Sequence, residues 1–190
     1  MLEVVHGVMG SGKSLEAIVL AHNLQTMGRP SLLLSYYKDT RFGSKVVASR
    51  IGVTWPCQVY NEKTNIPELF ALHQDPKNLE RQTLIVEEAQ FLTAEQAESL
   101  HRASVNYRVV CYGLRVAANG KPFPGMSVLL SLADSVREIA TYCACSQDKK
   151  ASMHLFFEDG KPVRNPDLIR IGDGEYRSVC SACYYSAIDA

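Results

Sequence analysis

The 190-residue sequence predicts an α/β fold with a three-layer core, in which helices cover both faces of a parallel sheet. Short apolar runs typical of buried strands alternate with periodic segments typical of helices. A glycine-rich loop joins the first strand to the first helix. From about Cys143 onward, paired cysteines and short β-like runs replace this alternation, which predicts a smaller β-rich part at the end of the chain.

The first elements are a strand, a loop, a helix and a second strand. Residues 2–6 form an apolar run that ends at a glycine, and the periodic segment 13–25 presents an apolar face. Gly28 and Pro30 end that helix, because glycine and proline are the strongest helix terminators. Residues 31–36 then read as a buried strand.

Two further buried strands are predicted at 83–86 and 109–112, both apolar and bounded by polar residues. Between them, 93–102 begins as a helix with Thr93 as N-cap and Gln96 in the capping-box position. The segment 39–78 has weak periodicity, and we interpret it as a partly mobile loop with one helix near 66–73.

The change of sequence pattern near the C-terminus indicates two domains. Residues 1–140 would form the α/β core, and residues 141–190 a small unit held together by a bound metal. The second unit has β-like runs at 154–157 and 168–171 and turn signals at 159–160 and 173–174.

Composition argues against several functional classes. The 20 basic and 20 acidic residues balance, so no net positive field favours a nucleic acid polymer or an anionic membrane. No apolar run approaches the roughly 20 residues of a membrane helix, and the N-terminal residues lack a secretory pattern. We therefore expect a cytoplasmic protein with reduced cysteines, no membrane partner and no nucleic acid partner.

The loop between the first strand and helix fits the phosphate-binding pattern G-x-x-x-x-G-K-[ST] without a mismatch. Glycines let backbone N–H groups turn toward phosphate oxygens, while the helix presents its positive end. Lys13 can reach the β- and γ-phosphates and Ser14 can ligate Mg²⁺. The alternative is a chance glycine turn at a helix start. The predicted P-loop residues are Gly7, Val8, Met9, Gly10, Ser11, Gly12, Lys13 and Ser14.

Two carboxylates, Glu87 and Glu88, follow the predicted strand at 83–86. At the carboxyl edge of a parallel sheet they would lie where ligands of such folds bind. One could hold Mg²⁺ through water and the other could take a proton from an attacking hydroxyl. The alternative is a solvated acidic turn before a helix.

Four cysteines in two close pairs predict a structural Zn²⁺ site. Cys143 and Cys145 form the first pair, and Cys180 and Cys183 the second. Four thiolates complete a tetrahedral zinc shell and leave no open position for water. Buried or redox-active cysteines are the alternative. The other two cysteines have no partner in sequence; Cys111 is most simply a core residue, and Cys57 carries no signal.

The chain resembles the type II thymidine kinase family, in particular its enterobacterial and phage branch. The resemblance spans nearly the whole length. Beyond the P-loop and the last cysteine pair, it rests on the segments 38–43, 49–52, 87–91, 111–115, 120–125 and 171–176.

The resemblance implies transfer of the ATP γ-phosphoryl group to the 5′-hydroxyl of thymidine, with deoxyuridine tolerated. Glu88 would be the general base, and Glu87, Ala89 and Gln90 would join the P-loop in ATP binding. Asp39 would lie near Mg²⁺, and Arg41 would neutralise phosphate charge. The zinc unit would form a lasso over the nucleoside, and members are commonly homotetramers. The implied nucleoside-binding residues are Phe91, Leu114, Phe123, Arg170, Ile171, Gly172 and Tyr176.

Three positions depart from the family pattern. Glu87 stands where the family usually has Asp, Ala89 replaces a Gly or Cys, and Ala118 falls where an aromatic residue is expected. A lost stacking partner at Ala118 would cost about 1 kcal/mol of nucleoside affinity. Because of this departure, an alternative function remains: the chain could be an ATP-binding or ATPase protein that uses its zinc unit for interactions and phosphorylates no nucleoside. Phe91, Phe123 and Tyr176 could equally be packing residues.

Overall fold

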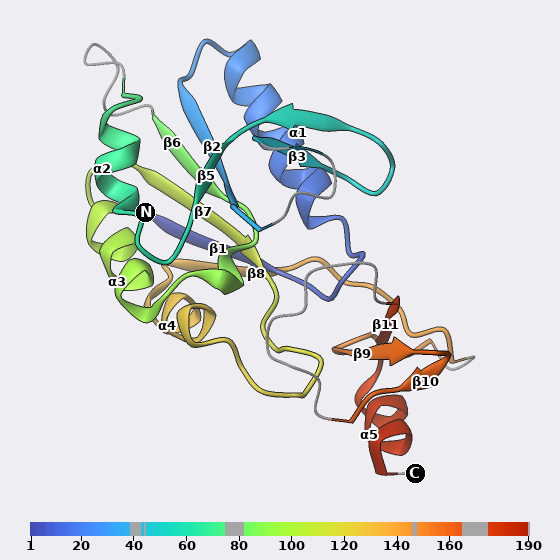
Figure 1. The fold of residues 1–190 in the computed structure, drawn as a ribbon. Helices are drawn as coiled ribbons and strands as arrows, with labels where there is room; N and C mark the ends of the chain where they lie inside the picture. Colours follow the sequence, from blue (N-terminus) through green and yellow to red (C-terminus); the bar gives the residue numbers. More distant parts are fainter. Residues whose placement is uncertain (39–42, 44, 75–81, 146–147, 165–174, 190) are drawn as a thin grey trace.

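The computed structural model describes residues 1–38, 43, 45–74, 82–145, 148–164 and 175–189. Several predicted features lie outside these residues: the β-like run 168–171, the turn 173–174, and Asp39, Arg41, Arg170, Ile171 and Gly172. Figure 1 shows a central sheet between helices, with a smaller β-rich part that carries the C-terminus at one end.

The core is a six-stranded sheet in the order β5-β2-β6-β7-β1-β8, and every pairing between neighbouring strands is parallel. Because both faces are covered, the central strands are almost continuously apolar. This confirms the predicted parallel sheet. The strands are β1 (Leu2–His6), β2 (Ser31–Tyr36), β5 (Gln58–Tyr60), β6 (Thr83–Val86), β7 (Arg108–Gly113) and β8 (Ser135–Glu138).

Helix α1 (Lys13–Thr26) packs on one face of the sheet, and α2 (Ile66–Ala71), α3 (Ala94–Ala103) and α4 (Pro124–Leu132) cover the other (Figure 1). Neighbouring side chains on a strand point to opposite faces. Val4 accordingly packs with the α2–α4 layer and Val5 with the α1 layer. The three-layer prediction is confirmed.

Helix α3 begins as its sequence predicts. The Thr93 hydroxyl accepts from the Gln96 N–H at 3.1 Å, and the Gln96 side chain accepts from the Thr93 N–H at 3.0 Å. This reciprocal pair satisfies two backbone donors that a helix start leaves free. The capping box is therefore confirmed.

The interpretation of 39–78 as loop and one helix was wrong for its middle part. Helix α2 is present, but β3 (Val46–Ala48) and β4 (Thr54–Pro56) form a hairpin, and β5 is an edge strand of the main sheet. Each of these strands has three residues, too few for a period-two pattern to stand out.

The C-terminal part, called the cysteine module below, comprises 141–145, 148–164 and 175–189. Its strands β9 (Met153–Glu158), β10 (Lys161–Pro162) and β11 (Glu175–Val179) form an antiparallel sheet. Asp159 and Gly160 both have left-handed backbones, with φ of 50° and 74°, which confirms the predicted turn. The terminal helix α5 (Ser181–Asp189) was not predicted. The domain boundary at residue 140 stays a prediction.

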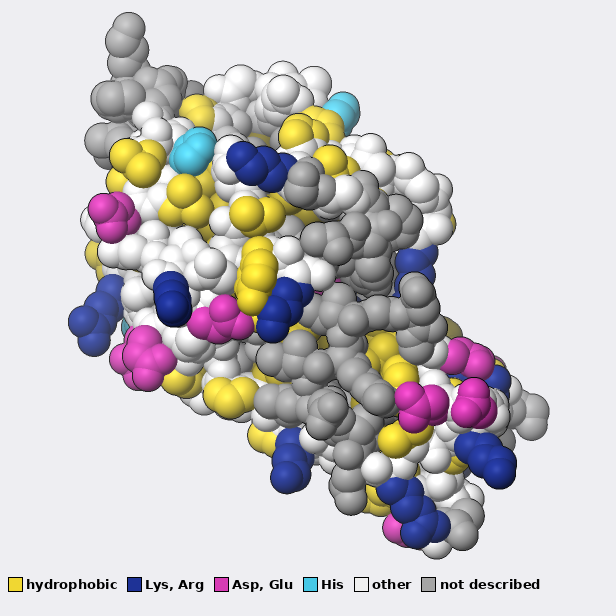
Figure 2. All heavy atoms as spheres, in the orientation of Figure 1, with side chains coloured by type: hydrophobic (Ala, Val, Ile, Leu, Met, Phe, Trp, Pro, Cys, Tyr) yellow, Lys and Arg dark blue, Asp and Glu magenta, His cyan; other side chains and the backbone are white. Residues whose placement is uncertain are grey.

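Among the described residues, none of the helices combines the length and the apolar character needed to span a bilayer. On the face shown in Figure 2, basic and acidic side chains are interspersed, in agreement with the balanced composition.

Candidate functional site

The glycine-rich loop connects β1 to α1 and has the backbone that its glycines permit. Gly10 and Gly12 have φ of 78° and 93°, which L-residues with a side chain rarely adopt. A Cβ on Gly7 would lie 2.8 Å from the Ile139 carbonyl oxygen, so only glycine fits this close approach. Gly12 directly precedes α1, whose free N–H groups therefore face the loop. The loop therefore has a glycine-dependent backbone at a helix start, and its role in binding phosphate stays a prediction.

Lys13 folds back over this loop. Its ammonium group donates to the carbonyl oxygens of Val8 at 2.9 Å and Gly7 at 3.2 Å, and its side chain is buried. Burial lowers the pKa of Lys13, and the neighbouring carboxylates of Glu88 and Glu87 oppose that decrease. The amine is thus held at the loop, within the electrostatic influence of two carboxylates.

Ser14 and Glu87 meet across the gap between α1 and the end of β6. The Ser14 hydroxyl donates to the Glu87 carboxylate at 2.6 Å, and Glu87 is only 2% exposed. The Glu87 N–H continues the sheet ladder by donating to the Leu34 carbonyl at 2.8 Å, which fixes the backbone behind the carboxylate. A hydroxyl and a carboxylate are hard oxygen donors of the kind that hold Mg²⁺ beside a nucleotide.

Glu88 adopts a left-handed backbone, with φ 54° and ψ 38°. The buried Tyr60 hydroxyl donates to the Glu88 carbonyl oxygen at 2.8 Å. The Gln90 side chain donates to the Glu88 carboxylate and accepts from the Leu114 N–H at 3.1 Å. Both ends of Glu88 are therefore held, and the carboxylate lines the same pocket as Lys13.

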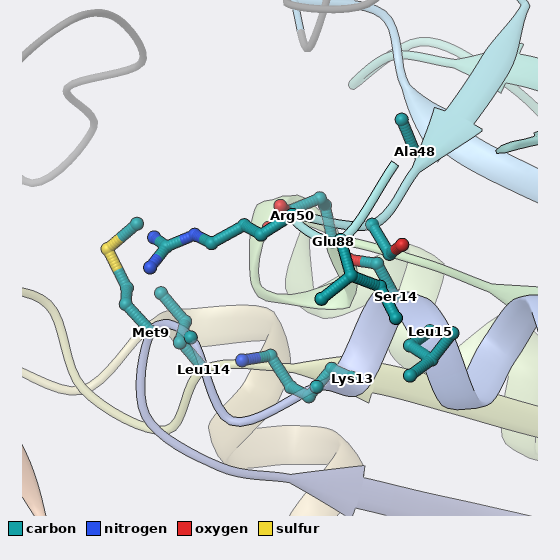
Figure 3. Close-up of a pocket in the computed structure, with 12 residues that line it drawn as sticks. Met9, Lys13, Ser14, Leu15, Ala48, Arg50, Glu88 and Leu114 are labelled. Carbon is teal, nitrogen blue, oxygen red and sulfur yellow. The ribbon is translucent and has the colours of Figure 1, made fainter. Parts of the chain in front are cut away.

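Figure 3 shows that pocket, which brings the phosphate loop, the start of α1 and Glu88 together with the β3–β4 hairpin. Arg50 reaches from the hairpin toward Met9 across the opening. A Cβ on Gly10 would lie 2.9 Å from an Arg50 guanidinium nitrogen, so this cation packs closely over the loop. The lining residues are Met9, Gly10, Gly12, Lys13, Ser14, Leu15, Ala48, Ser49, Arg50, Ile51, Glu88 and Leu114.

Sequence reasoning missed Arg50 as a site residue. It lies in a segment that contributes to the resemblance, 49–52, yet nothing local indicates where its side chain goes. Its position depends on the hairpin that the sequence did not predict.

The expected nucleoside-pocket aromatics Phe91 and Phe123 lie together. Their ring centroids are 6.0 Å apart in an edge arrangement, and Phe91 also stacks obliquely on Tyr36 at 4.6 Å. Phe123 belongs to the core and Phe91 packs against it. Both the packing and the substrate-binding interpretation therefore remain open.

Tyr176 lies in the cysteine module, where its ring contacts Phe156 at 5.0 Å and His154 at 6.0 Å. Ala118, where the family has an aromatic residue, is 7% exposed.

The four predicted ligand cysteines converge, with all Sγ atoms within 4.8 Å of one another. The Cys143–Cys183 and Cys145–Cys180 sulfur distances are 3.8 and 3.9 Å. Zn–S bonds of about 2.3 Å place neighbouring sulfurs about 3.8 Å apart in a tetrahedron, so the donor set fits Zn²⁺.

Hydrogen bonds from the Cys145 and Cys180 N–H groups lower the pKa of Cys143 to about 6, which favours the thiolate that metals bind. Side-chain hydrogen bonding to Cys180 instead raises the pKa of Cys183 to about 12. Cys111 is fully buried in β7, as expected of a core residue, and Cys57 is also buried.

Comparison with known proteins relates this geometry to a family. Residues 1–184 match the profile of the family described as thymidine kinase. The thymidine kinase of Yersinia pseudotuberculosis is 37% identical over 190 residues, with 97% of this chain and 94% of that protein covered. The thymidine kinases of Chromobacterium violaceum and Streptococcus pyogenes serotype M3 are each 35% identical, with 95% of both proteins covered.

Among solved structures, the genome packaging NTPase B204 from Sulfolobus turreted icosahedral virus 2, in complex with sulfate, superposes with a TM-score of 0.48 at 17% identity. The alignment covers 77% of this chain and 76% of that one. A similarity at this level carries no argument about function.

Proposed function

The chain belongs to the thymidine kinase family, and from this premise we propose how its pocket transfers the γ-phosphoryl group of ATP to the 5′-hydroxyl of thymidine. The protein is an ATP-dependent nucleoside kinase. The observation that carries the proposed roles is the convergence of the phosphate loop, Lys13 and Glu88 on one pocket, beside the Ser14–Glu87 contact of 2.6 Å.

In this proposal Glu88 is the general base. Its carboxylate accepts the proton of the 5′-hydroxyl while the 5′-oxygen forms a bond to the γ-phosphorus. The bond from that phosphorus to the β–γ bridging oxygen breaks, and ADP leaves. Lys13 and the N–H groups of 7–14 neutralise the charge that spreads over the phosphate oxygens.

Ser14 and Glu87 would hold Mg²⁺ with the nucleotide, Ser14 directly and Glu87 through water. Bound there, the cation supplies positive charge to the β- and γ-phosphate oxygens. Glutamate is one methylene longer than the aspartate usual in the family, so the geometry with which Glu87 would hold the cation differs from that of an aspartate. The chain's own contribution is the fixed backbone of Glu87 and its hydrogen bond from Ser14.

The remaining site residues stay proposals. We assign Ala89 and Gln90 to the ATP side, and Phe91, Leu114 and Phe123 to the nucleoside, with deoxyuridine tolerated. Asp39, Arg41 and the backbone of 170–172 keep the roles that the family resemblance implies, as does Tyr176. Arg50 joins this set as a second cation for phosphate charge, because it packs against Gly10.

The proposal also covers the wider properties of the protein. Cys143, Cys145, Cys180 and Cys183 would bind one structural Zn²⁺, which cross-links the chain and supplies no open coordination position. We propose a cytoplasmic homotetramer without a nucleic acid or membrane partner. Sedimentation velocity of the zinc-loaded protein tests the oligomeric state.

A direct assay tests the activity. Purified protein with Mg²⁺, ATP and radiolabelled thymidine should yield thymidine monophosphate. Glu88→Gln should lower that rate at least 100-fold and leave ATP binding within about twofold, since it removes only the proton acceptor. Glu98→Gln, at an exposed position on α3, is the matched control. The family comparisons do not favour the ATPase alternative, and ADP production without a nucleoside product would reinstate it.

A further inference from the structure

One strand of the cysteine module contacts the phosphate loop directly. The Ser178 hydroxyl of β11 donates to the Met9 carbonyl oxygen at 2.6 Å, across 169 positions of sequence. Met9 lies inside the loop and its side chain lines the pocket. Ser178 therefore fixes the orientation of a loop peptide whose side chain lines the pocket.

A second hydroxyl of the module holds the loop that follows β7. The Tyr184 hydroxyl of α5 donates to the Ala118 carbonyl oxygen at 2.9 Å, and Tyr184 is 2% exposed. A Cβ on Gly120 would lie 3.1 Å from the same hydroxyl, so the ring packs tightly on this loop. The loop runs from Leu114 to Phe123, two of the proposed nucleoside contacts.

The module also lies beside the start of the phosphate loop. His154 and Ser152 lie with His6, Gly7 and Val8 around a small cavity at the junction. His6 and His154 are buried, and the Nδ1 atom of each has no hydrogen-bond partner within the described part of the chain. The module therefore packs against the start of the phosphate loop as well as against Met9.

The two hydroxyls flank the second cysteine pair. Ser178 precedes Cys180 by two residues, and Tyr184 directly follows Cys183. Anything that fixes these two cysteines also fixes the segment that carries both hydroxyls. Met9 and Ala118 are therefore tied to one short piece of chain anchored at the four-sulfur cluster.

We propose that Ser178 and Tyr184 are positioning residues, through which the cysteine module sets both substrate loops. Ser178 holds the phosphate loop and acts on ATP binding. Tyr184 holds the 114–123 loop and acts on nucleoside binding. The kinetic part of this inference rests on the proposed function, but the structural coupling does not.

The kinetic test removes one hydroxyl at a time. Ser178→Ala should weaken ATP binding about 3- to 10-fold, the loss typical of one hydrogen bond, and leave the thymidine KM within about twofold. Tyr184→Phe should instead raise the thymidine KM about 3- to 10-fold and leave ATP binding within about twofold. Ser186→Ala and Tyr185→Phe are matched controls, because both side chains are exposed on α5, and they should change neither value. Equal effects of both test variants on both substrates would contradict the separate roles.

The second readout needs no catalysis. In the absence of substrates, amide hydrogen exchange should become at least threefold faster at residues 7–12 in Ser178→Ala. In Tyr184→Phe the same acceleration should appear at residues 115–121. The zinc content of each variant is measured alongside. Chelating the metal from the wild-type protein should accelerate both segments. Ser178→Thr keeps the hydroxyl and should restore slow exchange and zinc content, even if Ser178→Ala loses metal.

Unchanged exchange in both loops after chelation, or failure of Ser178→Thr to restore it, would overturn the coupling. If exchange responds as expected but wild-type protein phosphorylates no nucleoside, the proposed function fails and the positioning role stands.

Discussion

At the scale of single residues, the backbone of Glu88 is the least ordinary feature of the site. A left-handed conformation costs an L-residue with a side chain about 1–2 kcal/mol. The neighbouring contacts offset that cost, because Tyr60 holds the carbonyl and Gln90 holds the carboxylate. The consequence is that Glu88 lines the same pocket as Lys13, where its charge acts on the Lys13 amine.

Tyr60→Phe should therefore lower kcat about 5- to 10-fold while the KM values for ATP and thymidine stay within about twofold. The variant removes one buried hydrogen bond to the Glu88 carbonyl, worth about 1 kcal/mol, and touches neither substrate. Steady-state kinetics at saturating Mg²⁺ measures this split. Tyr37→Phe, at a 40% exposed position, is the matched control. An unchanged kcat in Tyr60→Phe would show that Glu88 needs no such support.

At the scale of elements, the loop after β7 bears on substrate affinity. Ala118 is buried and its carbonyl is held by Tyr184, so an aromatic ring at this position would meet packed neighbours. Ala118→Phe should lower the free energy of unfolding by about 1–3 kcal/mol through overpacking, and should not tighten thymidine binding. Urea unfolding and the thymidine KM test this. A lower KM with unchanged stability would mean that the family's aromatic residue fits after all.

Strand β9 carries a pH-dependent contribution through His154. Burial and the charge of Lys13 lower the pKa of this residue to about 4. As the pH falls from 6.5 toward 4, His154 binds a proton in the unfolded chain but not in the folded chain. The free energy of unfolding therefore decreases as the pH decreases. Between pH 7.5 and 5 this loss is about 2 kcal/mol.

His154→Gln should remove this part of the acid sensitivity. Urea midpoints at pH 7.5 and 5, with zinc in excess, should therefore differ less in the variant than in the wild type. His22→Gln replaces an exposed histidine and should keep the wild-type difference. Equal pH dependence in wild type and His154→Gln would show that the histidine accepts its proton in the folded state.

The elements that sequence could predict are those that carry their own signal. The runs at 31–36 and 83–86 are buried on both faces, and Thr93 with Gln96 marks a helix start by side-chain chemistry alone. Strands β3, β4 and β5 depend on tertiary pairing, since each has only three residues. Helix α5 begins between Cys180 and Cys183, so the segment was interpreted as ligand spacing and its helix was not predicted.

At the scale of the whole molecule, the site was predictable where distant motifs share one sheet edge. The carboxyl ends of parallel strands meet there, so the phosphate loop and the Glu87–Glu88 pair had to be neighbours once the fold was known. Arg50, Ser178 and Tyr184 gave no such signal. They reach the site from a hairpin, a strand and a helix whose docking is set by packing between the core and the cysteine module.

The same docking makes metal content a property of the whole molecule. We expect close to one zinc per chain by elemental analysis, because the four sulfurs match a tetrahedral shell and a disulfide would need sulfurs about 2.05 Å apart. Cys180→Ser should lose the metal and lower Tm, since three ligands bind more weakly and the segment from Ser178 to Tyr184 loses its anchor. Cys57→Ala, at a buried cysteine outside the cluster, should retain the zinc. Full zinc occupancy in Cys180→Ser would mean that the cluster does not hold the metal as a four-cysteine site.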